Sequence, residues 1–224
     1  FRQLILTENE SQRKQCLQQM LKMQQNDFLD IFRAAENHEV VIRLLDPPTH
    51  EFLPDSDKPD YDHQIAGLAE KLGWSEQQCR SRIRMLRESN PMMGCRGCRQ
   101  AIVHPDLVDM QTRAIMNAYV LAHREGIRVR TQIMIPMVFS NHEIDVISPI
   151  IVTAANEVLS QEHVQLEKDE TCFDLGTMIE LPRACLRADR IATTKHISFV
   201  SFGTNDLTQM VFGLSRDDTE QFMV

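Results

Sequence analysis

Charged side chains interrupt four apolar stretches of the sequence near their carboxyl ends. Arg43 lies in "VVIRLLD", Arg96 closes "MMGCR", and Glu180 lies within "LGTMIELP". Asn205 and Asp206 end the fourth stretch, "ISFVSFGTND". A charge buried in such a stretch costs several kcal/mol unless it is paired or bound to a ligand. The four stretches therefore predict either structural ion pairs between arginines and carboxylates or a binding site.

The carboxylates and the arginines suit two different ligands. Glu180 and Asp206, together with the amide of Asn205, offer the oxygen ligands of Mg²⁺, which usually keeps waters and substrate oxygens in its shell. Arg43 and Arg96 suit a bidentate grip on a phosphate or carboxylate. The combination predicts a phosphorylated or carboxylated metabolite bridged by Mg²⁺.

The turn "SFGTND" has a functional and a structural interpretation. Gly203 permits close approach of the backbone to a ligand, and the following helix would present free N–H groups to an anion. Capping of that helix by Thr204, Asn205 or Asp206 would explain one polar residue, but it does not explain three in a row. No nucleotide P-loop signature surrounds Gly203.

Apolar stretches of strand length alternate about five times with helical patterns, which predicts βα units around a parallel sheet. In such folds ligands bind beyond the carboxyl ends of the strands, so the charged residues are expected to meet on one face. A capping box at Thr7 and Glu10 predicts a long helix that starts there and ends near Asn37. The segment "NPMMGCRGCR" is expected to form a turn and a short strand, and residues 47–63 a loop. The other expected strands are "VVIRLLD", "VRTQIMIPMVF", "DLGTMIELP" and "ISFVSFG", and the other expected helices cover 64–71, 76–88, 106–124, 143–159 and 183–194 and start again at "NDLTQ".

Length and charge narrow the classes of protein. The chain has 224 residues, 42% of them hydrophobic, which can supply a substantial core. Its formal charge of −8 argues against a general nucleic-acid binder. No apolar run is long enough to span a membrane, and no signal-peptide pattern is present at Phe1.

Six cysteines are spread along the chain, and only Cys95 and Cys98 are close together. This pair allows a redox or a zinc interpretation, but the nearby His104 does not complete a zinc-binding spacing. The sequence favours reduced, structural cysteines and an intracellular protein. Cytoplasm and an organelle such as a plastid or a glycosome-like compartment both remain open.

Five motifs resemble successive motifs of the pyruvate phosphate dikinases, which are phosphoenolpyruvate (PEP)-utilising enzymes. They extend through essentially the whole chain in the same order as in the C-terminal PEP/pyruvate-binding barrel of that family. "GTNDLTQ" and "GTMIE" also occur in similar form in PEP synthase and in enzyme I of the sugar phosphotransferase system, whereas "RLLDPP" and "RGCR" are more specific to the dikinases. The motifs are "RLLDPPTHEFLP", "NPMMGCRGCR", "RTQIMIPMV", "GTMIELPRA" and "SFGTNDLTQMVFGLSRDD".

The resemblance implies a role for each candidate residue. Arg43 and Arg96 match arginines that hold the phosphoryl group and the substrate, and Glu180 and Asp206 match carboxylates that bind Mg²⁺. A further phosphate-side arginine matches Arg216. The substrate-binding turn matches Ser201, Gly203, Thr204 and Asn205.

The resemblance also implies the fold and the reaction. Residues 1–224 are expected to form an incomplete (β/α)₈ TIM-type barrel with about strands two to six, its first strand and last two βα units lying outside the chain. The family interconverts ATP, phosphate and pyruvate with AMP, pyrophosphate and PEP, and a mobile domain carries the phosphoryl group on a histidine from a nucleotide-binding domain to this barrel. The family's proton-donating cysteine is expected after Val224, so none of the six cysteines inherits that role.

These implications favour a piece of a longer enzyme that cannot run the full reaction alone. Two alternatives stay open: a PEP synthase or enzyme I-like phosphotransferase, distinguished by its substrate, and a shortened, non-catalytic regulator that binds a metabolite. An open barrel would expose apolar strand edges, so we also expect a homodimer or poor solubility.

Overall fold

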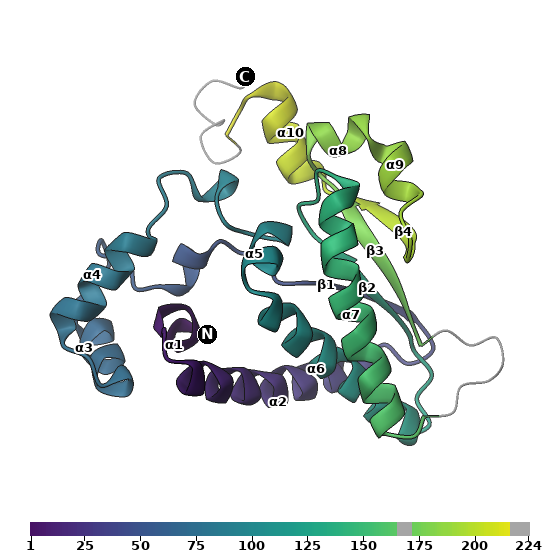
Figure 1. Ribbon diagram of the computed structural model, residues 1–224, viewed down its shortest axis with the longest axis horizontal. Helices are drawn as coiled ribbons and strands as arrows, with labels where there is room; N and C mark the ends of the chain where they lie inside the picture. The colour runs from purple at the N-terminus through teal and green to yellow at the C-terminus, as the bar shows by residue number, and fades with distance from the viewer. Residues whose placement is uncertain (165–171, 216–224) are drawn as a thin grey trace.

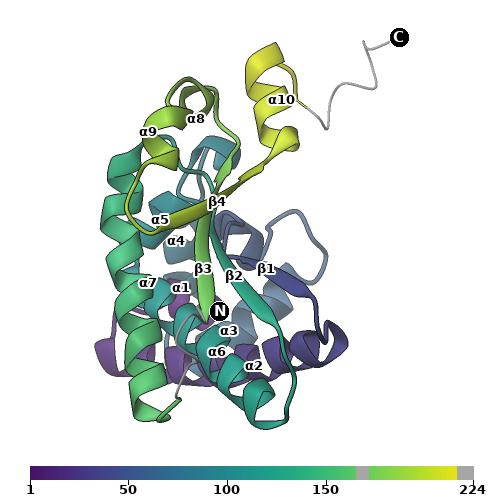
Figure 2. The ribbon, with the colours of Figure 1, turned by 90° about the vertical axis from the view of Figure 1, so that its right-hand side faces the viewer.

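The part of the chain that the structure describes contains a parallel sheet of four strands (Figure 1). The structure is a computed structural model and describes residues 1–164 and 172–215. The two outer strands have no further strand beside them in these residues, so the barrel is not closed (Figure 2). The predicted α/β class with a parallel sheet is confirmed. In sheet order the strands are β1 (Glu39–Arg43), β2 (Arg130–Ile135), β3 (Phe173–Ile179) and β4 (Ile197–Phe202).

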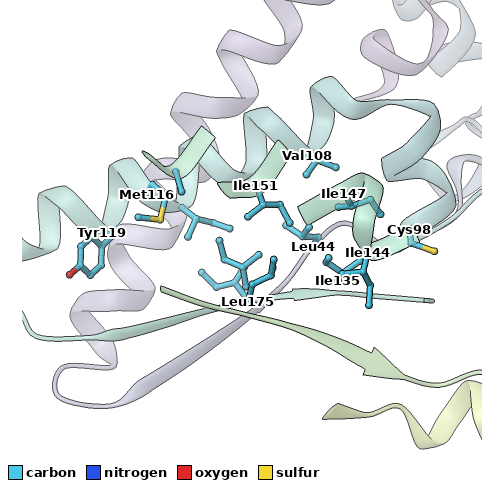
Figure 3. Close-up of a cluster of buried hydrophobic side chains, with 14 of the residues drawn as sticks. Leu44, Cys98, Val108, Met116, Tyr119, Ile135, Ile144, Ile147, Ile151 and Leu175 are labelled. Carbon is cyan, nitrogen blue, oxygen red and sulfur yellow. The ribbon is translucent and has the colours of Figure 1, made fainter. Parts of the chain in front are cut away.

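The main hydrophobic core lies between this sheet and the helices α6 (Pro105–Arg124) and α7 (Asn141–Gln161). Alternate side chains of a strand point to the same face, so the register partners Ile42, Ile133 and Leu175 enter this core together. Figure 3 shows side chains of both helices meeting those of the sheet. Each buried aliphatic side chain contributes roughly 1.5–3 kcal/mol, so the core fixes the register of the strands.

The long N-terminal helix α2 (Glu10–Ala34) packs along α6 (Figure 1). The predicted capping box is wrong, because the N-cap is Asn9, whose side chain accepts from the Gln12 N–H at 3.0 Å. Thr7 instead ends a short helix that the sequence analysis did not predict, α1 (Arg2–Leu6), and its N–H donates to the Gln3 carbonyl. Thr7 therefore belongs to the connection between the two helices.

Helices α3 (Tyr61–Leu72) and α4 (Glu76–Leu86) form a lobe that lies away from the sheet (Figure 1). They follow a 3₁₀ turn, η1 (Thr49–Phe52), inside the segment expected to be a loop. A capping box of Ser75 and Gln78 starts α4. The lobe has a hydrophobic core of its own, which includes Leu53, Ile65, Leu68, Leu72 and Ile83.

The strand expected at "MMGCR" is absent from the described residues, which leaves four strands instead of about five. The chain forms a 3₁₀ turn, η2 (Pro91–Met93), then a loop, and then helix α5 (Cys98–Val103). Gly97 has φ +55°, whereas the residues of a regular strand have φ of about −120° to −140°. The apolar residues of this segment therefore belong to a turn and a loop that are bonded to the end of the sheet, and not to a strand within it.

The elements at the carboxyl end of the chain follow the predicted order. Helix α10 (Thr204–Phe212) follows β4, and the helix expected over 183–194 forms two short helices, α8 (Pro182–Leu186) and α9 (Ala188–Ala192). Helices α6 and α7 confirm the predictions for 106–124 and 143–159. Among the described residues, we find no helix with the length and apolar character needed to cross a membrane.

Candidate functional site

Arg96 is the centre of a buried cluster of charges at the carboxyl ends of the strands. Its guanidinium donates to Asp46 from Nε at 3.3 Å and from Nη2 at 2.5 Å, and to Asp206 Oδ1 from Nη1 at 3.3 Å. Arg43, the last residue of β1, also pairs with Asp46. Arg96, Asp46 and Asp206 are each at most 9% exposed. The cluster thus joins the end of β1 to the first turn of α10.

Arg96 reaches this cluster from a loop that is fastened to the end of β2. The Cys98 N–H donates to the Pro136 carbonyl at 3.1 Å, and the Cys98 thiol donates to the Met137 carbonyl at 3.0 Å. A Cβ at Gly97 would lie 2.6 Å from Met137 Cβ and 2.8 Å from an Asp46 oxygen, so only glycine fits here. The loop therefore brings Arg96 to the place that a strand end was expected to provide.

Glu180 follows β3 and is 1% exposed. Its Oε1 accepts from the Met137 N–H at 2.6 Å, and Met137 has φ +60°, which is uncommon for a residue with a side chain. Burial raises the pKa of Glu180 above its ordinary value and the nearby Asp206 acts in the same direction, while the Met137 N–H, Arg43 and Arg96 oppose them. Burial disfavours the charged form of Glu180, and a cation bound beside the carboxylate would stabilise that form.

The turn after β4 approaches Glu180 closely. The Gly203 N–H donates to the Ile179 carbonyl at 3.0 Å, and a Cβ at Gly203 would lie 2.6 Å from Glu180 Oε2. Gly203 is the N-cap of α10, and no side chain caps this helix. Helix capping therefore explains none of the polar residues Thr204, Asn205 and Asp206. The structural interpretation of "SFGTND" survives only in the Arg96–Asp206 ion pair.

The structure joins some of the predicted site residues by direct contacts and places others only at the same end of the sheet. Arg43, Arg96 and Asp206 are joined through ion pairs and Asp46, and Glu180 lies near enough to feel the charges of Arg43, Arg96 and Asp206. The side chains of Ser201, Thr204 and Asn205 are at the same end of the sheet and have no hydrogen-bond partner among the described residues. Arg216 lies outside the described residues.

The sequence analysis assigned no role to two contributors to the site. Asp46 is the acid that binds both arginines, and its only signal was its position at the end of the apolar stretch "VVIRLLD". Met137 supplies a backbone N–H to Glu180, and a backbone contact of this kind leaves no signal in the side-chain pattern.

The two carboxylates offer a ligand set of the kind that Mg²⁺ accepts. Glu180 Oε2 and Asp206 Oδ2 receive no hydrogen bond from the described part of the chain, whereas the other oxygen of each accepts one. No group of three or more His, Cys, Asp or Glu side chains in residues 1–164 and 172–215 could hold a metal ion. Two protein carboxylates nevertheless suffice for Mg²⁺ when substrate oxygens and waters complete the shell.

The two cysteines near the site, Cys95 and Cys98, have thiol pKa values above the ordinary value. All six cysteines are free. Burial raises the pKa of Cys98, with the Glu143 carboxylate acting in the same direction, and burial also raises the pKa of Cys95. A thiol with a raised pKa forms little of the nucleophilic thiolate, so we interpret the contact of Cys98 with Met137 as structural.

The raised pKa of Glu180 predicts that the stability of the metal-free chain, in buffer with EDTA, depends on pH. A carboxyl whose pKa is raised by folding contributes stability below its unfolded pKa, about 4.3, and this stability is lost as the pH rises through the folded pKa. Glu180→Gln keeps an acceptor for Met137 and carries no charge, so we expect the variant to gain stability over the wild type as the pH is raised from 4 to 8. Urea unfolding at several pH values measures this difference, and a difference independent of pH would contradict it.

The comparisons with known proteins place the chain in a family. The family model of the PEP-utilising enzyme PEP-binding domain matches residues 2–223. The chain therefore belongs to the PEP-utilising enzymes. Its relatives include the pyruvate, phosphate dikinases of Giardia intestinalis (42% identical over 223 residues) and Rhizobium meliloti (45% over 224 residues), and the chloroplastic pyruvate, phosphate dikinase 1 of Arabidopsis thaliana (45% over 227 residues). The alignments cover 99–100% of this chain and 22–24% of the relatives, so the chain spans about a quarter of their length.

Proposed function

We propose that the chain is the domain of a pyruvate phosphate dikinase that binds pyruvate or PEP together with Mg²⁺. The observation that carries the proposal is the meeting of Arg96, Asp206 and Glu180 at the carboxyl ends of a parallel sheet. Structural ion pairs account for Arg96 and Asp206, but Glu180 is buried without a side-chain cation bonded to it among the described residues. A ligand cation supplies the missing charge.

The charged residues divide into two roles. Glu180 and Asp206 would hold Mg²⁺, which when bound would polarise the oxygens of pyruvate and stabilise its enolate. Arg43 and Arg96 would bind the carboxylate and the phosphoryl group, where catalysis is mainly positioning and electrostatic stabilisation. Asp46 fixes both guanidinium groups, because it accepts from each of them.

The turn of residues 201–205 completes the proposed substrate site. Gly203 leaves space beside Glu180, and the uncapped first turn of α10 offers N–H groups to an anion. The free side chains of Ser201, Thr204 and Asn205 add donors and acceptors, and we assign Arg216 to the phosphate side of the same site.

The full reaction would use parts of a longer protein. In this proposal a phosphohistidine domain brings the phosphoryl group to Arg43 and Arg96, and a nucleotide-binding domain loads that histidine from ATP. The chain alone would bind pyruvate or PEP and would not complete the ATP-dependent cycle. The six free cysteines favour an intracellular compartment for such a protein.

Binding of oxalate, a stable analogue of the pyruvate enolate, tests this function. We expect isothermal titration calorimetry to detect oxalate binding in Mg²⁺ and none in EDTA, and PEP should compete with oxalate. A well-folded chain that binds neither ligand in Mg²⁺ would contradict the proposal.

Self-association is a separate expectation that follows from the open sheet. Val41 on β1 and Val200 and Phe202 on β4 are 49%, 39% and 69% exposed, and β1 and β4 are the outer strands of the described sheet. Exposed apolar edges of this kind pair with other chains. We propose that the isolated chain dimerises, and that Val200→Lys shifts it towards the monomer in sedimentation velocity. The control is Val103→Lys, which changes an exposed valine of α5. A wild-type chain that stays monomeric at high concentration would contradict this expectation.

A further inference from the structure

A cleft of about 610 Å³ lies in the lobe of α3 and α4, between the segment that follows η1 and the helix α4. It shares no residue with the charge cluster at the sheet, and three of its lining residues, Leu53, Tyr61 and Ile83, also belong to the hydrophobic core of the lobe. Its volume falls in the range of roughly 300–1,000 Å³ that is typical of small-molecule sites. The cleft is lined by Glu51, Leu53, Pro54, Asp55, Ser56, Lys58, Tyr61, Arg80, Ile83, Arg84 and Arg87.

One wall of the cleft is a row of arginines on α4 and its end. Arg80, Arg84 and Arg87 are spaced four and three residues apart, which places them on one face of a helix. Arg80 is neutralised, because it pairs with Asp62 at 2.9 Å and with Glu76 at 3.1 Å. The other two cations have no carboxylate within ion-pair distance in the described part of the chain, although Arg87 donates to the Ser56 hydroxyl at 3.2 Å.

The opposite wall adds a third cation and two acids. Lys58 is exposed and forms no ion pair with any described carboxylate. Glu51 and Asp55 also line the cleft, yet neither pairs with Arg84 or Arg87 within the described residues. Oppositely charged side chains therefore line the same cleft, and no ion pair between them spans it within the described residues. In a chain of net charge −8, the lining of this cleft has three unpaired cations and two acids among the described residues, so its unpaired charge is net positive.

The floor of the cleft is apolar and aromatic. Leu53, Pro54 and Ile83 are buried in the lobe, and the Tyr61 ring carries the Arg80 guanidinium at 5.1 Å from its centroid. A simple inorganic anion would use the cations and leave this floor in contact with water. A ligand that combines anionic groups with an apolar or planar body would use both surfaces.

We propose that this cleft is a second ligand site, which binds a small organic phosphate. Its phosphate groups would lie among Lys58, Arg84 and Arg87, and its apolar or planar body would lie on Leu53, Ile83 and the Tyr61 ring. The concave shape and the apolar side chains of the lining favour a small molecule over an acidic protein segment.

The test uses the wild-type chain and the double variant Arg84→Gln/Arg87→Gln, with ADP, pyrophosphate and adenosine as probes. We expect ADP to bind the wild type at least tenfold more tightly than pyrophosphate or adenosine, and the double variant to lose at least tenfold in ADP affinity. Arg190→Gln, which removes an exposed arginine of α9, is the matched control and should bind ADP as the wild type does. Equal ADP affinity of the wild type and the double variant would overturn the proposal.

Three further measurements distinguish the proposal from the alternatives. Glu51→Gln removes an acid from the lining and should raise ADP affinity about two- to fivefold, whereas loss of folding in the double variant cannot produce such a gain.

A decamer of glutamate should bind more weakly than ADP. If the decamer binds more tightly and Arg84→Gln/Arg87→Gln weakens it, the cleft is a docking site for an acidic segment and the proposal is wrong. Binding of oxalate with Mg²⁺ should be unchanged in the double variant, which separates this cleft from the site at the sheet.

Discussion

Replacement of Asp206 by alanine is expected to abolish Mg²⁺-dependent oxalate binding and to leave the fold intact. The variant loses one of the two proposed carboxylate ligands, so oxalate affinity in Mg²⁺ should fall about 100-fold or more, at the upper end of the losses caused by changes around metal sites. Arg96 keeps both of its bonds to Asp46, and we therefore expect the free energy of unfolding to fall by only about 1–3 kcal/mol. Calorimetry and urea unfolding measure the two effects.

Asp189→Ala is the matched control for this prediction. Asp189 also lies in the first turn of a short helix near the carboxyl end of the chain, but it is exposed and outside the charge cluster. It should keep the oxalate affinity of the wild type. If Asp206→Ala unfolds the chain, or binds oxalate as tightly as Asp189→Ala does, then Asp206 has only its structural role as a partner of Arg96.

Replacement of Arg96 by alanine should have a larger effect on stability and should also abolish anion binding. Arg96 is the only cation bonded to Asp206 among the described residues, so its removal leaves a buried carboxylate without a partner. Breaking a buried pair in this way costs about 3–5 kcal/mol. Oxalate binding should disappear because one of the two proposed substrate arginines is gone and Asp206, a proposed Mg²⁺ ligand, has lost its partner.

Two substitutions separate the charge of Arg96 from its geometry. Arg96→Lys keeps a positive charge but cannot donate to Asp46 and Asp206 from one planar group, so we expect it to recover only part of the stability. Arg128→Ala removes an exposed arginine and should change the free energy of unfolding by less than about 0.5 kcal/mol. An Arg96→Ala variant as stable as Arg128→Ala would show that the cluster does not hold the strand ends together.

Most of the fold could be predicted from the sequence because the core imposes a clear period on it. The apolar stripes of α6 and α7 repeat with the helical period and match the buried faces of those helices, and β2 has the continuous burial of a central strand, with five of its six residues buried. The boundaries at Thr7 and at "MMGCR" were predicted wrongly for different reasons. At Thr7 a local helical bond to the Gln3 carbonyl ends α1, whereas at "MMGCR" a tertiary hydrogen bond of Cys98 to Pro136 holds a loop where local pattern favoured a strand.

The site residues could be predicted where a charged side chain interrupts an apolar strand. They could not be predicted where a backbone N–H makes the contact. Arg43, Glu180 and Asp206 follow the rule that ligands bind beyond the carboxyl ends of parallel strands. The same rule applied to Arg96 gave the right place for the wrong reason, because a loop and not a strand delivers it. The contact of Met137 with Glu180 depends on a left-handed backbone that no apolar pattern encodes.

The central claim is that Glu180 and Asp206 share one metal ion, and anomalous diffraction tests it most directly. Mn²⁺ replaces Mg²⁺ at carboxylate sites and scatters anomalously, so crystals of the chain soaked in Mn²⁺ and oxalate would locate the ion. The account predicts one strong anomalous peak on the order of 2.2 Å from an oxygen of each carboxylate, with oxalate on its open side towards Arg43 and Arg96. A peak that contacts neither Glu180 nor Asp206, or no peak at this end of the sheet, would contradict it.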